Sequence, residues 1–236
     1  MTTYKLQQTS IWKFSDRGKW ATHKGDYRGN WSPHIPKNLI LKYTQPTDIV
    51  LDPFLGSGTT LIECKLLNRH GVGIDVNLDS LKLSKNRLNF NTETNSKQTL
   101  IKGDARNLSM LNNNSIDFVC THPPYSNIIK YSLDLKEDLS RLDYIDFLRE
   151  MYNVSKECFR VLKPNHYCAF MMGDIRKNSN VIPLGFLTMQ TFLNSGFTLK
   201  EIIIKEQINC KSTDYWQDKH LSFYLLAHEY IFVLKK

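Results

Sequence analysis

The chain has 236 residues, 41% of them hydrophobic and 23% charged, with a mean hydropathy of -0.38; this composition is typical of a folded globular protein and excludes a disordered or collagen-like chain. Its 31 Lys and Arg against 23 Asp and Glu give a formal net charge of +8, which favours a polyanion such as nucleic acid as the partner. No apolar run reaches the roughly 18 residues of a membrane span, and the first residues lack an apolar signal region, so we expect a cytoplasmic protein without a membrane partner.

Residues 1–30 form an arm of aromatic and basic side chains, in which glycines interrupt any regular period. Two interpretations are compatible: the tryptophans anchor the arm on the domain, or the aromatic rings stack on bases while the cations hold phosphates. On the second interpretation, the candidate nucleic-acid contacts in the arm are Arg17, Lys19, Lys24 and Arg28.

From residue 36 onward, short apolar runs alternate with segments of helical periodicity. We expect strands over residues 48–52, 71–75, 99–101, 116–120, 166–172, 197–207 and 223–234, and helices over 36–43, 59–68, 78–90, 143–162 and 181–194. Strands that alternate with helices predict a mostly parallel α/β sheet covered on both faces. The last two strands have no helix between them and predict an antiparallel pair at the sheet edge.

Residues 31–236 are therefore expected to be a single domain, with no large separate target-recognition domain. The five cysteines form neither a Cys-x-x-Cys pair nor a zinc-ligand spacing. We expect them to be reduced, mostly buried thiols, and we expect no metal site.

A glycine-rich turn follows the strand at 48–52, in the run Asp52-Pro53-Phe54-Leu55-Gly56-Ser57-Gly58-Thr59-Thr60. Such a turn brings backbone N–H groups and a helix N-terminus close to a ligand, at the edge of a parallel sheet where cofactors bind. It is not a phosphate-binding P-loop, because no Lys follows the second glycine. Asp75 ends the next strand, where a ribose-binding carboxylate is expected. The alternative is a tight strand–helix turn without a ligand.

A second cluster, Thr121-His122-Pro123-Pro124-Tyr125, follows the strand at 116–120. Two consecutive prolines cannot continue a central strand, and they fix the backbone so that its carbonyls lack local N–H partners. A rigid carbonyl beside an aromatic face can hold a planar group that carries an amine. Taken alone, the cluster is better explained as an ordinary Pro-Pro loop with a core tyrosine.

Together the two clusters resemble the S-adenosylmethionine-dependent DNA amino-methyltransferases, which methylate N4 of cytosine or N6 of adenine. Residues 52–60 look like the D-P-F-x-G-S-G-T-T cofactor motif, and residues 121–125 look like the [D/N/S]-P-P-[Y/F/W] catalytic motif. Weaker similarities lie at residues 32–36 (the H-x-P segment), 73–75, 103–105 and 157–164. The resemblance covers most of the chain from Trp31 onward. It implies a Rossmann-like methyltransferase fold and S-adenosylmethionine as the cofactor.

By this resemblance, the cofactor-binding residues are His34, Asp52, Phe54, Gly56, Ser57, Gly58, Thr59, Asp75, Asp104 and Thr121. The Gly56–Gly58 turn would hold the methionine part, Asp75 the ribose, and the region of Asp104 the adenine. The catalytic residues are His122, Pro123, Pro124 and Tyr125: the carbonyl of Pro123 and the side chain of His122 accept the amine hydrogens, and Tyr125 stacks on a base flipped out of the duplex.

His122 departs from the family, which usually has Asp, Asn or Ser at this position. Thr121 and the absence of an acidic residue at 122 favour cytosine N4 over adenine N6. If the pKa of His122 were unperturbed, activity would fall near pH 6.5. A tRNA guanine-N2 methyltransferase and a non-catalytic nucleic-acid-binding subunit with a decayed site are the alternatives.

Three segments are candidates for reading the target sequence: the arm, residues 126–141, and residues 210–221, where Lys211, Trp216 and Lys219 are candidate DNA contacts. Each is equally well explained as a solvated loop. Asp174 and Arg176 are expected to be either an ion pair or a phosphate contact. The expected partner is double-stranded DNA, with a second copy of the chain or a companion restriction enzyme as further partners and the nucleoid as the location.

Overall fold

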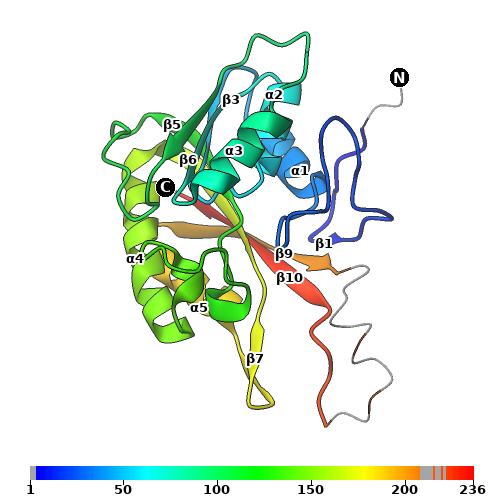
Figure 1. Cartoon of the computed structure of the whole chain (residues 1–236), viewed down its shortest axis with the longest axis vertical. Helices are drawn as coiled ribbons and strands as arrows, with labels where there is room; N and C mark the ends of the chain where they lie inside the picture. Colours follow the sequence, from blue (N-terminus) through cyan, green and yellow to red (C-terminus); the bar gives the residue numbers. More distant parts are fainter. Residues whose placement is uncertain (1–3, 208–214, 216–218, 220–221) are drawn as a thin grey trace.

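An eight-stranded sheet runs through the centre of the molecule in the order β1-β9-β10-β6-β5-β2-β3-β4 (Figure 1). The structure is a computed structural model and describes residues 4–207, 215, 219 and 222–236. The strands of the sheet are β1 (Ile11–Trp12), β2 (Ile49–Asp52), β3 (His70–Asp75), β4 (Gln98–Lys102), β5 (Ile116–Thr121), β6 (Leu162–Met172), β9 (Thr198–Glu206) and β10 (His228–Lys235).

The helices are α1 (His34–Tyr43), α2 (Thr59–Leu66), α3 (Leu78–Arg87), α4 (Tyr144–Val161) and α5 (Leu184–Asn194), with short 3-10 helices η1 (Ser126–Ile128) and η2 (Leu139–Arg141). A hairpin of β7 (Ile175–Lys177) and β8 (Asn180–Ile182) projects from one end of the molecule (Figure 1). Within the described residues, no helix is long and apolar enough to cross a membrane.

The expected mostly parallel α/β sheet with an antiparallel pair is confirmed. Strands β2 to β6 pair in parallel, whereas β10 is antiparallel to both of its neighbours, β6 and β9. The sequence did not indicate β1, which pairs in parallel with the outer side of β9. This short strand covers hydrogen-bonding groups of β9 that would otherwise form an open sheet edge.

The side chains of a central strand point alternately to the two faces of the sheet, and here both sets are apolar, which explains why both faces are covered. In β10, Ile231 and Val233 are buried against α1 and the arm, whereas Phe232 and Leu234 are buried in the cluster that contains α4 and α5. Successive side chains of a strand point to opposite faces, so a strand that is apolar at every position must be buried on both.

The arm is anchored to the domain. Trp12, Phe14 and Trp31 are buried in one cluster with residues of α1. Trp20 and His23 both contact one carboxylate oxygen of Glu63 in α2, at 2.6 and 2.7 Å. Burial of these rings supports the anchoring interpretation of the arm.

The expected helix at 181–194 begins later than the sequence indicated. Strand β8 takes residues 180–182, and Pro183 precedes the first helical residue, Leu184. The expected strand at 166–172 begins earlier, at Leu162, directly after α4. Pro164 therefore lies near the start of a strand, where its missing N–H is tolerated.

Candidate active site

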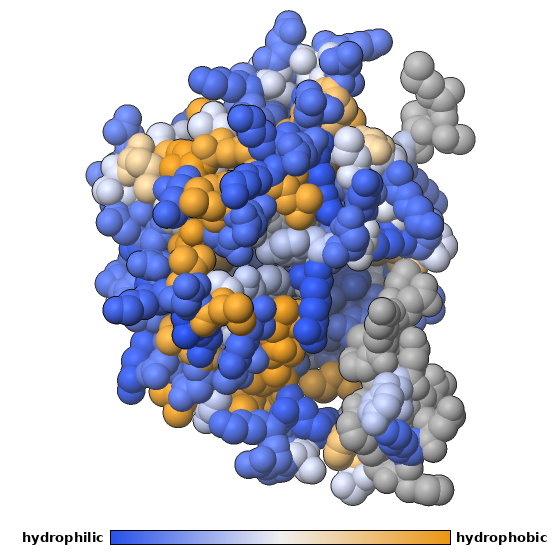
Figure 2. Space-filling view, viewed as in Figure 1, coloured by the Kyte–Doolittle hydropathy of each residue, from blue (hydrophilic) through white to orange (hydrophobic). Residues whose placement is uncertain are grey.

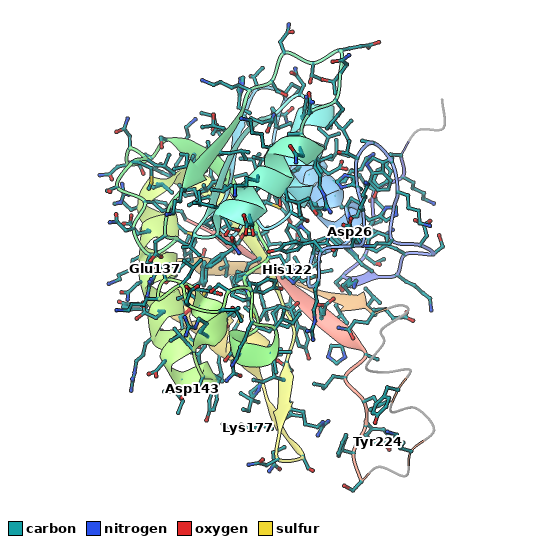
Figure 3. All side chains as sticks on the ribbon, in the orientation of Figure 1. Asp26, His122, Glu137, Asp143, Lys177 and Tyr224 are labelled. Atoms are coloured by element: carbon teal, nitrogen blue, oxygen red, sulfur yellow. The ribbon has the colours of Figure 1, made fainter. Side chains whose placement is uncertain are left out.

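One cleft opens at the carboxyl ends of the central strands, where the glycine-rich turn and the proline-rich loop meet. It encloses about 790 Å³, a volume that includes open solvent at its mouth. His122 lies near the middle of the molecule (Figure 3), and the same face is recessed around this position in the space-filling view (Figure 2). Of the predicted site residues, the lining includes Asp52, Phe54, Gly56, Ser57, Thr59, Asp75, Asp104, His122 and Pro124.

Asp52 ties the two motifs together. Its carboxylate accepts hydrogen bonds from the Thr121 hydroxyl at 2.7 Å, from the Phe54 backbone N–H at 3.1 Å and from the Thr60 hydroxyl. Burial raises the pKa of Asp52 to about 6, even though these hydrogen bonds favour the ionised form. The predicted cofactor residue Thr121 is buried and touches Asp52; it is not part of the cleft lining.

Asp75 shapes the glycine-rich turn. One of its carboxylate oxygens accepts the backbone N–H of Gly56 at 2.8 Å, and the other accepts that of Asn77 at 2.8 Å. Burial raises the pKa of Asp75 to about 6. Gly58 has a φ of +85°, and a Cβ there would meet Ser84 Oγ at 3.0 Å. Gly58 therefore shapes the turn from behind, against α3, and Gly56 is the glycine that lines the cleft.

Asp104 lines the cleft, but its carboxylate is already engaged. Arg106 donates to both of its oxygens, and the same guanidinium reaches Glu150 on α4 at 3.0 Å. The carboxylate thus anchors the loop after β4.

His122 lies between two aromatic rings. Its ring is stacked on Trp31, with centroids 5.4 Å apart and 16° between planes, and meets Tyr125 edge-on. Burial lowers the pKa of His122 to about 4, although the carboxylate of Glu229 acts in the opposite direction. The condition of the sequence-based expectation, an unperturbed pKa of His122, is therefore not met, and we expect the imidazole to stay neutral well below pH 6.5.

Tyr125 belongs to a buried polar network that the sequence motifs did not indicate. Its hydroxyl contacts His122 Nε2 at 2.9 Å and donates to Glu229 Oε1 at 2.7 Å. Lys205 donates to the other oxygen of Glu229 at 2.9 Å. The signal in the sequence was weak: Lys205 follows three isoleucines and Glu229 precedes a buried run, but both strands carry further charged residues.

His34 lies outside the cleft lining. Its ring is packed between Tyr4, Phe14 and Trp20, and Nδ1 contacts the Tyr4 hydroxyl at 3.1 Å. The structure thus places this predicted cofactor residue in the packing of the arm on α1.

Two segments that were not predicted to line the cleft form part of its wall. Tyr27 from the arm and Tyr131 from the loop after β5 stack with centroids 5.9 Å apart. Asn77 Nδ2 donates to the Tyr131 carbonyl at 3.2 Å, which fastens this loop to the start of α3. Glu137, Asp138 and Leu139 also line the cleft, so part of the candidate segment 126–141 is a wall of the cleft.

The proposed DNA contacts of the arm divide into two kinds. Lys19, Lys24 and Arg28 are exposed. Arg17 is half-buried and donates to the Trp31 carbonyl at 3.0 Å, and burial lowers its pKa. Lys211 and Trp216 lie outside the described residues, whereas Lys219 lies over the Tyr215 ring.

Asp174 and Arg176 turn to different partners. Asp174 accepts the backbone N–H of Gly185 at 3.1 Å, whereas Arg176 donates to the carbonyls of Ser179 and Tyr224. Of the two alternatives, the ion pair between them is therefore wrong, and the phosphate contact stays a prediction.

Comparison with known proteins identifies the family. Residues 3–86 and 116–236 match the family of N6/N4 methyltransferases described as DNA methylases, and the chain belongs to this family. It is 33% identical over 152 residues to the type II beta methyltransferase M.BslI of Bacillus sp. (strain NEB-606), covering 58% of this chain and 16% of that protein. It is 41% identical over 81 residues to the type II methyltransferase M2.MboI of Moraxella bovis, covering 34% and 30%.

Solved structures agree on the fold. A SAM-dependent methyltransferase from Methanosarcina mazei superposes with a TM-score of 0.59 at 18% identity, covering 84% of this chain and 96% of that one. TrmN from Thermus thermophilus superposes with a TM-score of 0.58 at 19% identity, covering 89% and 50%. The expected Rossmann-like methyltransferase fold is confirmed.

Proposed function

We propose that this member of the DNA methylase family transfers a methyl group from S-adenosylmethionine to the exocyclic amine of a DNA base, with cytosine N4 as the target atom. The observation that carries the proposal is that residues of the glycine-rich turn and of the proline-rich loop line the same cleft. The chain matches less than a third of the length of the two relatives named above, so its activity, substrate and partners are proposals.

The cleft residues fit a cationic nucleoside. Carboxylates of Asp52 and Asp75 complement a sulfonium and an ammonium group and accept ribose hydroxyls, and apolar groups such as Phe54 and Leu139 suit an adenine ring. S-adenosylmethionine supplies an activated methyl group on its sulfonium. Asp75 is the proposed ribose ligand; Asp104 acts mainly through the loop that it anchors to Arg106.

The proposed base site lies at the proline-rich loop. Among the described residues, the Pro123 carbonyl accepts no hydrogen bond, so both of its lone pairs are available to a ligand. The amine nitrogen of a base is a poor nucleophile, because its lone pair is delocalised into the ring. Hydrogen bonds from the amine to the Pro123 carbonyl and to His122 would localise that pair in the transition state, which is catalysis by positioning and fixed dipoles.

Cytosine N4 is favoured over adenine N6 for the reason given by the sequence: Thr121 precedes a residue that is not acidic. The pKa of His122 near 4 supports its role as an acceptor for the target amine, since a neutral imidazole keeps one nitrogen able to accept a hydrogen bond. Adenine N6 remains the alternative target, because the chain belongs to a family named for both positions.

Exposed cations of the arm are the proposed contacts to the phosphates of double-stranded DNA. Lys19, Lys24 and Arg28 are exposed, and Tyr27 in the same segment lines the cleft, so the arm reaches from the cleft to the surface. Lys211, Trp216 and Lys219 stay proposed contacts. A second copy of the chain or a companion restriction enzyme is a further proposed partner. The proposed location is the nucleoid.

Incubation with methyl-labelled S-adenosylmethionine and separate DNA and tRNA pools tests the proposal. We expect label in DNA only, released as N4-methylcytosine. Label in tRNA alone would support the guanine-N2 alternative, and label in neither pool would support a non-catalytic binding subunit.

A further inference from the structure

The Glu229–Tyr125–His122 network contains one hydrogen bond whose direction is fixed. Burial raises the pKa of Glu229, but the Lys205 ammonium and the hydrogen bonds from Tyr125 and Lys205 outweigh burial and keep this pKa below its usual range. An ionised carboxylate only accepts, so the single phenolic proton of Tyr125 is directed at Glu229 Oε1.

The direction of this first bond determines the second. With its proton committed to Glu229, the Tyr125 oxygen can only accept at its 2.9 Å contact with His122. The proton of the neutral imidazole must therefore be on Nε2. In this tautomer Nδ1 carries the lone pair. Nδ1 has no hydrogen-bond partner among the described residues and is not one of their fully buried, unpartnered polar atoms, so it keeps some exposed surface, on a residue that lines the cleft.

We infer that Glu229 is a positioning residue: acting through the Tyr125 hydroxyl, it holds His122 as the Nε2–H tautomer, so that Nδ1 is the atom that accepts from the target amine. This inference rests on the proposed function. It explains how a histidine can stand where the family has Asp, Asn or Ser. In the other tautomer Nδ1 would be a donor and would repel an amine hydrogen.

The same tautomer gives the reaction a destination for its proton. The new C–N bond uses the lone pair of the amine nitrogen, and the electron pair of the broken C–S bond stays on sulfur, so one N–H proton must leave. Nδ1 of His122 can take that proton, and the resulting imidazolium would face the carboxylate of Glu229 through Tyr125. The imidazole returns to neutral by losing the proton to solvent.

Residues of β9, of β10 and of the loop after β5 together form this network. Glu229 in β10 is the direct cross-strand partner of Lys205 in β9. Tyr125 reaches them because residue 173 is glycine: a Cβ there would lie 2.9 Å from the Tyr125 ring. The charged or titratable groups facing Glu229 are thus Lys205, Tyr125 and His122, and the ring of Trp31, between the arm and α1, covers His122.

Substitution Glu229→Gln should reverse the hydrogen bonds. The Lys205 ammonium requires an acceptor, so the glutamine carbonyl turns to Lys205 and the glutamine NH₂ turns to Tyr125. Tyr125 then accepts from the glutamine and donates to His122 Nε2, which moves the imidazole proton to Nδ1. We expect turnover to fall by about 10²-fold, while the affinities for S-adenosylmethionine and DNA stay unchanged.

The matched control is Glu206→Gln, which removes the same charge from an exposed ion pair with Lys13 on the neighbouring strand β9. It should leave turnover unchanged. A double-mutant cycle with Tyr125→Phe tests the route: once the hydroxyl is gone, Glu229→Gln should cause little further loss. Full additivity of the two substitutions would show that Glu229 does not act through Tyr125.

The decisive readout is nitrogen NMR of the imidazole in the protein without substrate, assigned through the signal that disappears in His122→Asn. We expect an unprotonated Nδ1 in the wild type and in Glu206→Gln, and a protonated Nδ1 in Glu229→Gln. A protonated Nδ1 in the wild type, or a tautomer that Glu229→Gln leaves unchanged, would overturn the inference. Because this readout needs no methyl transfer, failure of the proposed function alone would leave the NMR result as expected.

Discussion

Trp31 and His122 lie ring on ring, with centroids 5.4 Å apart and 16° between planes. Trp31 belongs to the segment that leads from the arm into α1, and His122 follows the central strand β5. Packing of the arm is therefore part of what keeps His122 out of water, and burial is the main reason why its pKa is lowered to about 4.

Replacing Trp31 with Ala should expose His122. Because desolvation disfavours the imidazolium, exposure should raise the pKa of His122 from about 4 toward its ordinary value near 6.5. The acid limb of the turnover profile should move to higher pH in parallel. Trp31→Phe keeps an aromatic ring on the imidazole and is the control. An NMR titration of His122 measures the shift, and an unchanged pKa in Trp31→Ala would show that the stacking does not control it.

Asp52→Asn should stabilise the protein at neutral pH. The pKa of Asp52 is raised to about 6 from 3.8, so the folded state favours the protonated form, and the stability that this group contributes is lost as pH rises through 6. Asn can accept from Phe54 and Thr121 and donate to Thr60, as a protonated Asp52 would. We expect a gain in the free energy of unfolding of up to about 3 kcal/mol above pH 7.

Urea unfolding of both proteins between pH 4 and 8 checks this expectation. The difference in unfolding free energy should be small near pH 4, should grow up to pH 6 and should then level off. A loss of stability at pH 8 would mean that the ionised carboxylate of Asp52 is needed by the fold.

Gly58→Ala should destabilise the glycine-rich turn. Residue 58 has a φ of +85°, and the added Cβ would lie 3.0 Å from Ser84 Oγ, which itself donates to the Gly56 carbonyl at 2.8 Å. The left-handed backbone alone should cost about 1 to 3 kcal/mol, and affinity for S-adenosylmethionine should fall because Gly56 moves.

Gly25→Ala is the matched control, since a Cβ there meets only the side chain of Arg17 and the backbone is not left-handed. Thermal unfolding and calorimetric titration of both variants provide the measurement. Equal behaviour of the two variants would remove the conformational argument for Gly58.

Neutralising Lys19, Lys24 and Arg28 together should weaken DNA binding without unfolding the arm, because all three side chains are exposed. Removal of one phosphate-binding cation should reduce the slope of log affinity against log salt by about 0.9. Arg17 is left in place because it holds the Trp31 carbonyl. The control is neutralisation of Arg149 and Lys156, exposed on α4 on the other side of the sheet. Identical slopes for the triple variant and the wild type would show that the arm serves only for packing.

The sequence was sufficient for the sheet and the two motifs because their signals are local. Apolar runs, glycine spacing and consecutive prolines each act within a few residues, and Asp52, Gly56 and His122 line one cleft. Residues brought in by chain-distant packing were missed. Tyr27 and Tyr131 line the cleft only because the arm and the loop after β5 stack there, over a sequence separation that no local period encodes.

His34 and Glu229 both show that local motifs do not encode contacts between distant parts of the chain: one was predicted to be in the site and is not, and the other was missed. His34 matched a motif, yet three aromatic rings of the arm surround it away from the cleft. Glu229 matched no motif, yet its strand register with Lys205 brings it to Tyr125. The lowered pKa of His122 was unpredictable for the same reason, since it depends on burial beneath Trp31 and beside Glu229.

Nucleoside mass spectrometry of DNA digested after incubation with the protein and methyl-labelled S-adenosylmethionine tests the central claim most directly, with His122→Ala as the impaired enzyme. We expect labelled N4-methylcytosine with the wild type, and far less with His122→Ala at unchanged cofactor affinity. Labelled N6-methyladenine alone would contradict the assignment of the target atom. The absence of any labelled nucleoside from the DNA would contradict the proposed function.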